Sequence, residues 1–282
     1  MRILITGSSG QLGTEIARQL SQKNKIIGID VIPGAWTQHV MNITDLDNID
    51  TIMKNIDAVI HIASLHAPHL TTCSKQAFID TNITGTLILL EAAIHHRIQR
   101  FVYTSTTSLY GFALLPREQA VWVTEELTPQ PRDMYDITKI TAEELCQHFA
   151  FAEGLPIICL RTARFFPELP EVMALYRLYR GVDVRDVAAA HVLAVTNQDI
   201  QFDVFNISAH SPFQESDMPA LLRDALSVLQ SRVPEAVEFF ARRGWSLPTS
   251  IDRVYVIEKA MRQLNYKPVY NFSSYISSLF CL

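Results

Sequence analysis

The stretch that decides the fold lies at the N-terminus and reads Arg2-Ile3-Leu4-Ile5-Thr6-Gly7-Ser8-Ser9-Gly10-Gln11-Leu12-Gly13. Its first five residues form a short run that is rich in β-branched side chains and ends at Gly7, which predicts a buried parallel strand, and residues 14–21 predict a helix. Of the three glycines, the first permits a tight turn, the second lets the backbone approach a pyrophosphate, and the third lets helix and strand pack closely. The pyrophosphate would lie on the helix N-terminus. The stretch therefore predicts a dinucleotide site, although Gly-x-x-Gly-x-x-Gly differs from the commonest fingerprint and an ordinary glycine-rich turn is the alternative.

An acidic residue at the end of the next predicted strand selects the cofactor. Residues 25–30 form this strand, and Asp30 stands about 20 residues after the glycines, where a carboxylate accepts hydrogen bonds from the adenosine ribose. A carboxylate would repel a 2′-phosphate, and the next three residues supply no arginine to bind one. Asp30 therefore predicts NAD rather than NADP, with a turn cap as its alternative role.

Strands and helices alternate along most of the remaining chain. Further strands are expected at residues 39–41, 57–63, 100–104, 155–160 and 202–207, and further helices at 46–54, 81–94, 135–153 and 183–196. This order predicts an α/β fold, Rossmann-like and doubly wound, with a mostly parallel sheet of about seven strands. We expect residues 1–164 plus 183–207 to form an NAD-binding Rossmann domain, and residues 165–182 plus 208–282 to form a small C-terminal substrate lobe.

A tyrosine and a lysine four residues apart supply candidate chemistry. In Tyr135-Asp136-Ile137-Thr138-Lys139 the phenol and the ammonium share one face of a helix. A nearby ammonium stabilises the phenolate over the phenol. Lowering the pKa of a tyrosine from ~10 to near neutral pH takes roughly 4 kcal/mol of such differential stabilisation. A run of hydroxyl residues follows the strand at 100–104, where open α/β sheets bind ligands. One of these hydroxyls could bind the reacting oxygen of a substrate, whereas capping is the alternative for the others.

Composition excludes several other classes of protein. The chain has 282 residues, 48% of them hydrophobic and 19% charged, as in a compact globular protein. A net charge of −5 argues against nucleic acid as a partner. The four cysteines are scattered, and His61, His66 and His69 lack ligand spacing, so no metal is expected. We find no signal peptide and no apolar run of the roughly 18 residues that a membrane span needs, and therefore expect a cytoplasmic protein.

Taken together, these motifs resemble the extended short-chain dehydrogenase/reductase family, which contains NAD-dependent sugar epimerases and dehydratases. The matching segments run almost end to end and are Thr6-Gly7-x-x-Gly10-x-x-Gly13, Asp30, Asn42-Ile43-Thr44-Asp45, His61-Ile62-Ala63, Asn82-x-x-Gly85-Thr86, Tyr110-Gly111, Tyr135-x-x-x-Lys139, Leu160-Arg161, Arg164-Phe165-Phe166-Pro167, Asp183-Val184-Arg185-Asp186-Val187-Ala188, Ala190-His191, Lys259-Ala260 and Leu264-Asn265-Tyr266-Lys267-Pro268. So many matches in the family's order are highly specific.

The resemblance implies a role for each matching residue. Tyr135 would be the acid/base during hydride transfer, Thr106 the catalytic hydroxyl, and Lys139 the residue that lowers the pKa of Tyr135 and holds the nicotinamide ribose. The cofactor-binding set is then Gly7, Ser9, Gly10, Gln11, Leu12, Gly13, Asp30, Asn42, Ile43, Ile62, Ala63, Ser64, Asn82, Thr104, Tyr135 and Lys139. Candidate substrate contacts are Ser105, Thr107, Arg164 and Arg180.

Two departures from the family pattern narrow the range of reactions and substrates to be expected. Family dehydratases carry an acidic pair directly after the catalytic threonine, whereas Thr107-Ser108 follow here, so dehydration is not expected. Only residues 168–181 separate two of the matching segments, a short lid that would not easily enclose a nucleoside diphosphate. Five arginines could still meet an anionic group, with solvated surface as their alternative: Arg161, Arg164, Arg177, Arg180 and Arg185.

We therefore expect an NAD-dependent oxidoreductase or epimerase acting on a hydroxyl or ketone of a sugar or sugar-like small molecule. The motifs leave epimerase and dehydrogenase or reductase open, and the short lid favours a dehydrogenase or reductase slightly. A non-catalytic, dinucleotide-sensing regulatory protein of the same fold is the alternative. The family also implies a homodimer through the helices at 81–96 and 135–153, although their apolar side chains have an equal claim to core packing.

Overall fold

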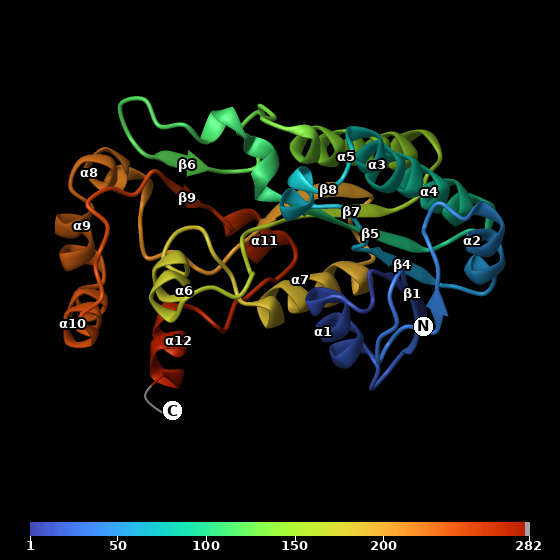
Figure 1. Ribbon diagram of the computed structural model, residues 1–282, viewed down its shortest axis with the longest axis horizontal. Coiled ribbons are helices and arrows are strands. Elements are labelled where there is room, and N and C mark those ends of the chain that lie inside the picture. Colours follow the sequence, from blue (N-terminus) through green and yellow to red (C-terminus); the bar gives the residue numbers. More distant parts are fainter. Residues whose placement is uncertain (280–282) are drawn as a thin grey trace.

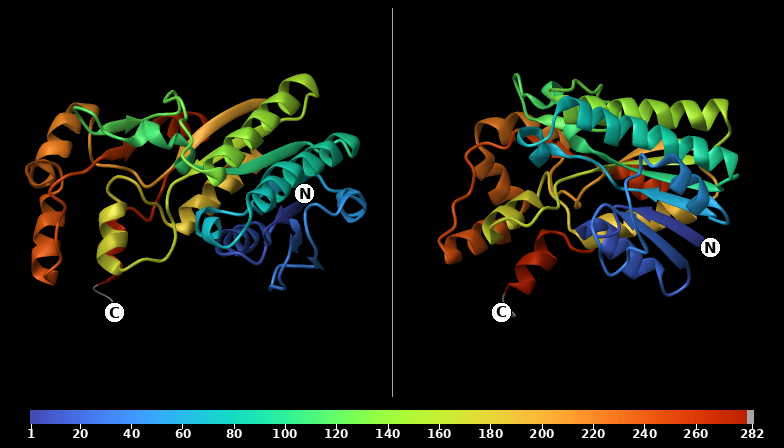
Figure 2. Two further views of the ribbon diagram at one scale, coloured as in Figure 1. Left: turned by 45° about the horizontal axis from the view of Figure 1, so that its top comes forward. Right: turned by 45° about the vertical axis from the view of Figure 1, so that its right-hand side comes forward.

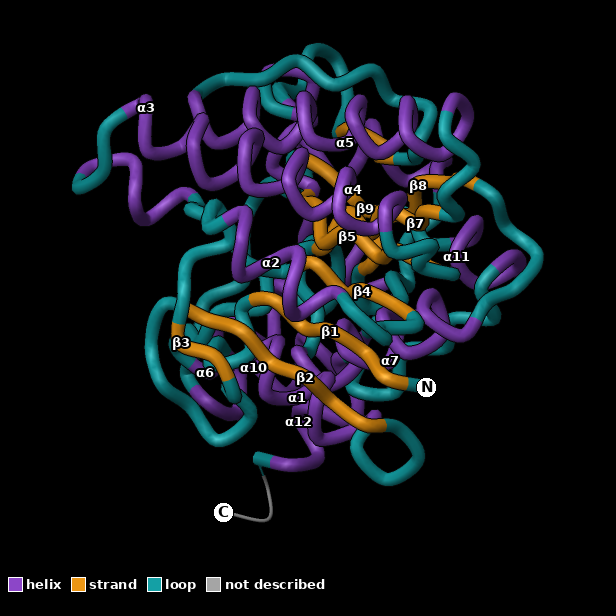
Figure 3. The backbone as a smooth tube through the Cα atoms, turned by 90° about the vertical axis from the view of Figure 1, so that its right-hand side faces the viewer, coloured by secondary structure: helices purple, strands orange, loops and turns teal. Residues whose placement is uncertain are grey.

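The computed structural model describes residues 1–279. A sheet of seven strands forms its centre, in the order β3-β2-β1-β4-β5-β7-β8, and every pairing within it is parallel (Figures 1 and 3). The strands are β1 (Arg2–Thr6), β2 (Lys25–Asp30), β3 (His39–Val40), β4 (Ala58–His61), β5 (Arg100–Thr106), β7 (Ile157–Thr162) and β8 (Phe202–Ile207). The predicted Rossmann-like fold is confirmed, and the sheet is parallel throughout.

Helices cover both faces of this sheet, as Figure 3 shows end-on. One face carries α1 (Gln11–Leu20) and α7 (Val184–Thr196), whose apolar sides pack against each other and against the strands. The other face carries α2 (Leu46–Met53), α4 (Gly85–His95) and α5 (Met134–Ala152). Because parallel strands buried on both faces need no polar side chains, their sequences are near-continuous apolar runs.

The helix predicted at 81–94 begins earlier and contains an irregular turn. It runs from α3 (Lys75–Phe78) through a π-helical segment (Ile79–Thr84) into α4. The π turn brings the buried Asn82 side chain toward Leu65, whose N–H and carbonyl it pairs with, and toward the Thr138 hydroxyl. Contrary to the expectation from the sequence, the run Lys75–His95 is long and apolar enough to cross a membrane by length and composition alone; 44% of its most apolar 18 residues are buried inside the fold.

A lobe stands beside the C-terminal ends of the strands (Figures 1 and 2). Its helices are α6 (Pro170–Tyr176), α8 (Met218–Arg223), α9 (Ala225–Arg232), α10 (Pro234–Arg243) and α12 (Phe272–Ser278). Aromatic side chains such as Phe213, Phe239 and Phe240 fill its core. Short 3₁₀ helices at Ala67–Thr71, Thr107–Tyr110, Phe112–Leu114 and Glu215–Asp217 complete the elements that connect the strands and the lobe.

The boundary of the lobe differs from the division expected from the sequence. A two-stranded parallel sheet joins β6 (Val121–Val123), assigned to the Rossmann domain, to β9 (Arg253–Tyr255), assigned to the lobe. Trp122 packs against the lobe core, whereas Val123 and Tyr255 belong to the core beside the central sheet. Conversely, α11 (Glu258–Gln263) packs against β8, and its residue Ala260 belongs to the core beside the sheet. Neither exchange has a local sequence signal, because both depend on pairing between distant segments.

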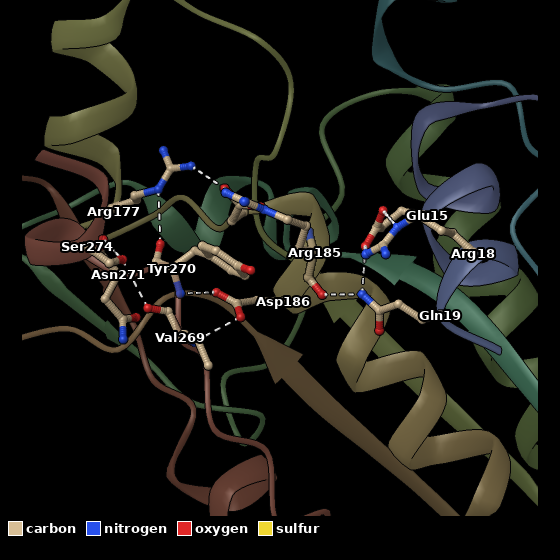
Figure 4. A network of polar contacts seen from close by, with 11 residues as sticks. Glu15, Arg18, Gln19, Arg177, Arg185, Asp186, Val269, Tyr270, Asn271 and Ser274 are labelled. Atoms are coloured by element: carbon tan, nitrogen blue, oxygen red, sulfur yellow. Dashed lines mark hydrogen bonds and ion pairs between the residues drawn. The ribbon is translucent and has the colours of Figure 1, made fainter. Parts of the chain in front are cut away.

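The segment after α11 is tied to α7 by the polar network in Figure 4. The Asp186 carboxylate accepts hydrogen bonds from the N–H groups of Val269 and Tyr270, at 2.9 and 2.8 Å. The Arg177 guanidinium donates to the Tyr270 carbonyl at 3.1 Å, and that of Arg185 lies 3.4 Å from the centre of the Tyr270 ring. The Asp-Val-Arg-Asp-Val motif therefore holds the C-terminal segment.

Candidate active site

The C-terminal ends of the central strands open into a cavity of about 830 Å³. It extends from the glycine-rich turn and Asp30, past the ends of β4 and β5, to Arg180 and the strand β9 of the lobe. Ligands of open α/β sheets bind at this position, where the strand order reverses beside β1.

The glycine-rich turn has a backbone that only glycine provides. Gly7 has a φ of +74°, in the left-handed region, and its N–H donates to the Ile29 carbonyl at 2.9 Å. A Cβ on Gly13 would clash with the carbonyl oxygen of Gly7. Gly10 caps α1 without a side chain, so the first N–H groups of this ten-residue helix are left to meet a ligand in the cavity. The turn fits a pyrophosphate.

Asp30 lines the cavity next to this turn. One oxygen of its carboxylate accepts from the Ser9 N–H at 3.0 Å, and the other accepts from the Ile32 N–H at 3.2 Å. Each oxygen keeps a further lone pair for a ribose hydroxyl. Ser9 itself does not line the cavity, because its hydroxyl donates to the Ile32 carbonyl and meets the Thr37 hydroxyl. The structure thus places Ser9 in support of the turn.

His61 holds the end of β4 in place. Burial and, to a smaller extent, the nearby charge of Lys139 lower its pKa to about 3, so the imidazole is neutral. The Thr6 hydroxyl accepts from the N–H groups of Ile62 and Ala63 and therefore donates to His61 Nδ1, at 2.8 Å. His61 Nε2 then donates to the Thr86 hydroxyl at 2.9 Å. This chain of hydrogen bonds fixes the backbone that lines the middle of the cavity.

Tyr135, Thr106 and Lys139 meet at the reacting part of the cavity. Burial raises the pKa of the Tyr135 phenol to about 12, although a hydrogen bond with Thr106 acts in the opposite direction. The sequence-based expectation that Lys139 lowers this pKa is not met. Its ammonium instead donates to the Thr104 carbonyl at 2.6 Å and lies 4.2 Å from the centre of the Tyr103 ring. Burial lowers the pKa of Lys139 to about 8.

His191 fixes the strand end that Lys139 contacts. Its Nδ1 donates to the Val187 carbonyl at 2.8 Å, so its Nε2 accepts from the Thr104 hydroxyl, also at 2.8 Å. Burial lowers the pKa of His191 to about 4, which keeps this pattern of donors and acceptors across the neutral range. The His191 position in the sequence motif thus has a structural role at the end of β5.

Of the expected site residues, the structure brings all but two to the cavity wall. Ser9 and Asn82 do not line it, and the remaining residues do: Gly7, Gly10, Gln11, Leu12, Gly13, Asp30, Asn42, Ile43, Ile62, Ala63, Ser64, Thr104, Ser105, Thr106, Thr107, Tyr135, Lys139, Arg164 and Arg180. Asn82 lies one layer behind, where it holds the backbone of Leu65.

Sequence reasoning missed several lining residues, chiefly in the lobe. Arg253 and Tyr255 come from β9, and Arg132 from the loop before α5. His66 and Phe166 both line the cavity and stack on each other, with ring centres 5.5 Å apart. Arg253 and Tyr255 belong to no motif, and only the pairing of β9 with β6 brings them to the site.

The five arginines considered as anion contacts separate into two groups. Arg161 is buried in an ion pair with Glu143, at 2.7 Å, and Arg177 and Arg185 both pair with Asp183. None of these three lines the cavity, so substrate binding describes none of them. Arg161 and Arg177 are buried, whereas the Arg185 side chain is 45% exposed, as the solvated-surface alternative expects. Arg164 and Arg180 are the two that line it.

Comparisons with known proteins agree with this architecture. A model of the NAD dependent epimerase/dehydratase family matches residues 3–174. An uncharacterized UDP-glucose epimerase, YtcB of Bacillus subtilis (strain 168), is 29% identical over 64% of this chain, which spans 62% of that relative, less than two thirds of its length. A dTDP-glucose 4,6-dehydratase of Escherichia coli is 25% identical over 97% of this chain and 90% of the relative.

The fold also matches solved structures. A short-chain dehydrogenase/reductase superfamily protein from Agrobacterium tumefaciens, solved with bound NAD, superposes with a TM-score of 0.75. The match covers 99% of this chain and 95% of that one, at 19% sequence identity. At this identity the likeness concerns the fold, which is the one derived above from the strands and helices.

Proposed function

Because the chain belongs to the NAD-dependent epimerase/dehydratase family, we propose that it oxidises or epimerises a hydroxyl-bearing carbon of a sugar-like substrate, with NAD as its cofactor. The observation that carries this proposal is that Tyr135 and Thr106, which are close enough for Thr106 to act on the pKa of the phenol, line the same cavity as the glycine-rich turn. A proton-transfer group and a dinucleotide cradle thereby share one space.

The residues present fit an NAD molecule. The turn at Gly7, Gly10 and Gly13 fits the pyrophosphate, because side chains at the first and last positions would be strained or would clash. Asp30 fits the hydroxyls of the adenosine ribose. Lys139 would hold the nicotinamide ribose. When bound, NAD accepts or returns the hydride at the substrate carbon.

Tyr135 would move the proton that accompanies the hydride. In oxidation its phenolate oxygen takes the proton of the substrate hydroxyl, and in reduction its O–H returns a proton to the carbonyl oxygen. Thr106 would hold the same substrate oxygen in place. Since burial favours the neutral phenol, the phenolate needs hydrogen bonds or a nearby positive charge, such as that of an oxidised nicotinamide, at this oxygen in order to form.

Oxidation or epimerisation is favoured over loss of water. Eliminating water needs an acid and a base beside the reacting carbon. Within residues 1–279, Asp30 is the one acidic residue that lines the cavity, and it lies at the adenosine end. Thr107 and Ser108 stand where an acidic pair would be needed. Relatives of both kinds match this chain, so product analysis must decide.

The test uses Tyr135→Phe, which keeps the ring and removes the hydroxyl. Wild type and variant are incubated with NAD and a panel of sugars and sugar acids, and products are identified by NMR and mass. We expect the variant to bind NAD as wild type does and to lose about 10²- to 10⁴-fold in rate. Full activity of the variant would refute the assigned role. Retained NAD binding with no turnover of any substrate by wild type would favour a dinucleotide-sensing protein.

We also propose that a homodimer forms through α4 and α5, which lie side by side on one face of the sheet. Ile137 and Phe151 are exposed on α5, at 43% and 66%. A molar mass of one chain in light scattering, at concentrations well above those of the activity assays, would contradict the dimer.

A further inference from the structure

We infer that the substrate carries its own acidic group, a carboxylate or a phosphate, and that Arg180 and Arg253 bind this group at the lobe end of the cavity. The inference rests on the proposed function and extends it from the reaction to the class of substrate. It predicts a compact sugar acid or sugar phosphate in place of a sugar attached to a nucleotide.

The charges that line the cavity are strongly asymmetric. Asp30 lies at the adenosine end, and the other charged lining residues, apart from histidines, are cations: Arg132, Lys139, Arg164, Arg180 and Arg253. Lys139 has its role beside the nicotinamide site, and Arg132 is paired with the buried Asp136. Three arginines therefore remain around the part of the cavity that NAD does not need.

Two of these three have unused binding capacity. Arg164 forms an ion pair with Glu168, which offsets its charge. Arg180 packs 4.1 Å from the centre of the Tyr176 ring and donates one hydrogen bond to the Tyr176 hydroxyl; within the described chain it has no ion pair with a carboxylate. Arg253 also pairs with Asp252, but through Nη2 alone, whereas Arg164 binds Glu168 through both Nε and Nη2; the Nε of Arg253 is buried without a hydrogen-bond partner among the described residues. A guanidinium with free donors is suited to bidentate binding of a carboxylate or phosphate.

The fold brings Arg180 and Arg253 together. The N–H of Tyr255 on β9 donates to the carbonyl of Tyr179 at 2.8 Å, which ties the residue before Arg180 to the strand of Arg253. Both arginines act electrostatically on the Tyr179 phenol, so both lie near it. An acidic group between them would meet donors from two separate elements of the lobe.

A polar atom elsewhere in the same cavity also lacks a partner. The Ser105 hydroxyl belongs to a residue that is 2% exposed, it lines the cavity, and it has no hydrogen-bond partner among the described residues. A buried hydroxyl without a partner is unfavourable, and a hydrogen bond from a bound hydroxylated ligand would remove that cost.

The shape of the cavity argues for a compact molecule. Its lobe wall consists of Phe165, Phe166, Arg180, Arg253 and Tyr255, and within residues 1–279 no residue of α8, α9, α10 or α12 reaches it. Behind the two phenylalanines lies a second hollow of only about 10 Å³, hardly enough for one water. The lining of the cavity therefore ends at the arginines and at β9, before the lobe helices α8 to α10.

The experiment measures binding to the NAD-saturated protein by calorimetry. Glucuronate, galacturonate and glucose 6-phosphate are compared with glucose and galactose, and UDP-glucose is included as the nucleotide-linked source of phosphate. We expect at least one of the three acids to bind 30-fold or more tightly than the neutral sugars and at least 10-fold more tightly than UDP-glucose. Arg180→Met or Arg253→Met should each weaken that acid 10- to 100-fold without changing NAD affinity, and Arg180→Lys should recover part of the loss.

Arg242→Met, at an exposed arginine on α10, controls for the loss of a positive charge and should bind the acid like wild type. Equal binding of acids and neutral sugars, or tightest binding of UDP-glucose, would overturn the inference. Unchanged acid binding in both arginine variants would do the same. If the protein turns over neutral sugars alone, the proposed function is supported and this inference is refuted. If it binds an acid tightly but turns over no substrate, the inference is supported and the proposed function is not.

Discussion

The ammonium of Lys139 donates a hydrogen bond of 2.6 Å to the carbonyl oxygen of Thr104. The contact joins the second turn of α5 to the end of β5, at the wall of the cavity. It leaves the Tyr135 phenol without a direct cationic partner, and burial then dominates the pKa values of both side chains. Burial of the Lys139 ammonium therefore lowers the free energy of unfolding, although the residue lines the reacting part of the cavity.

This cost predicts a pH dependence of stability. The native pKa of Lys139 is about 8, whereas an unfolded lysine titrates near ~10.4, so between these values the unfolded chain binds more protons and stability rises with pH. Between pH ~8 and ~10, we expect the unfolding free energy of wild type to rise by about 2 kcal/mol relative to that of Lys139→Met. Urea titrations across this range measure it. Lys54→Met, at an exposed lysine, is the control, and parallel profiles of wild type and Lys139→Met would contradict the burial of the charge.

Two substitutions in the glycine-rich turn should separate effects on stability from effects on cofactor binding. Gly13→Ala places a Cβ against the Gly7 carbonyl and should lower both the melting temperature and the affinity for NAD. At Gly10 the backbone is ordinary and a Cβ meets its nearest neighbour at 3.4 Å. Gly10→Ala should therefore melt like wild type but lose at least 10-fold in NAD affinity, because the methyl group points at the pyrophosphate. Scanning and titration calorimetry of both variants measure the melting temperature and the NAD affinity. Unchanged NAD affinity in Gly10→Ala would show that the pyrophosphate lies elsewhere.

Asp30 should set the preference between the two dinucleotides. Asp30→Asn removes the charge that repels a 2′-phosphate while its amide oxygen can still accept the Ser9 N–H. We expect the ratio of NAD to NADP affinity to fall by at least 10-fold, mainly through improved binding of NADP. Competition titrations with both dinucleotides measure the ratio. A wild type that already prefers NADP would show that Asp30 does not contact the adenosine ribose.

Asp186 should anchor the C-terminal segment. Asp186→Ala leaves the N–H groups of Val269 and Tyr270 unpaired, which should destabilise the fold by about 2–4 kcal/mol. Asp186→Asn keeps one acceptor oxygen and should destabilise the fold less than Asp186→Ala. Urea unfolding gives the free energies, and limited proteolysis followed by mass analysis should show earlier cleavage after residue 266 in Asp186→Ala. A change below about 0.5 kcal/mol would mean that water replaces the carboxylate without cost.

The strands, the turn and the chemical residues could be predicted because each has a local signal. The apolar runs fix the strands, the glycines fix the turn, and Tyr135 and Lys139 share a helix face at their sequence spacing. The direction of the Lys139 side chain could not be predicted, since it depends on the carbonyl of Thr104, which is 35 residues away along the chain.

The lobe end of the site was harder to predict for the same reason. Arg253 reaches the cavity only because β9 pairs with β6, and neither three-residue strand has a distinctive pattern. Arg177 and Arg185 looked like possible ligand contacts in the sequence, yet both are taken by Asp183. Which arginines stay available is a property of the folded chain and cannot be read from arginine spacing.

The most direct test of the central claim follows the NAD complex of the protein after rapid mixing with the sugars and sugar acids. The observable is the near-ultraviolet absorbance of reduced nicotinamide, recorded for wild type and for Tyr135→Phe at equal NAD occupancy. We predict that wild type forms reduced nicotinamide with at least one substrate, transiently in an epimerase and lastingly in a dehydrogenase, and that Tyr135→Phe forms it at least 100-fold more slowly. Equal rates in the two proteins would contradict the assignment of proton transfer to Tyr135.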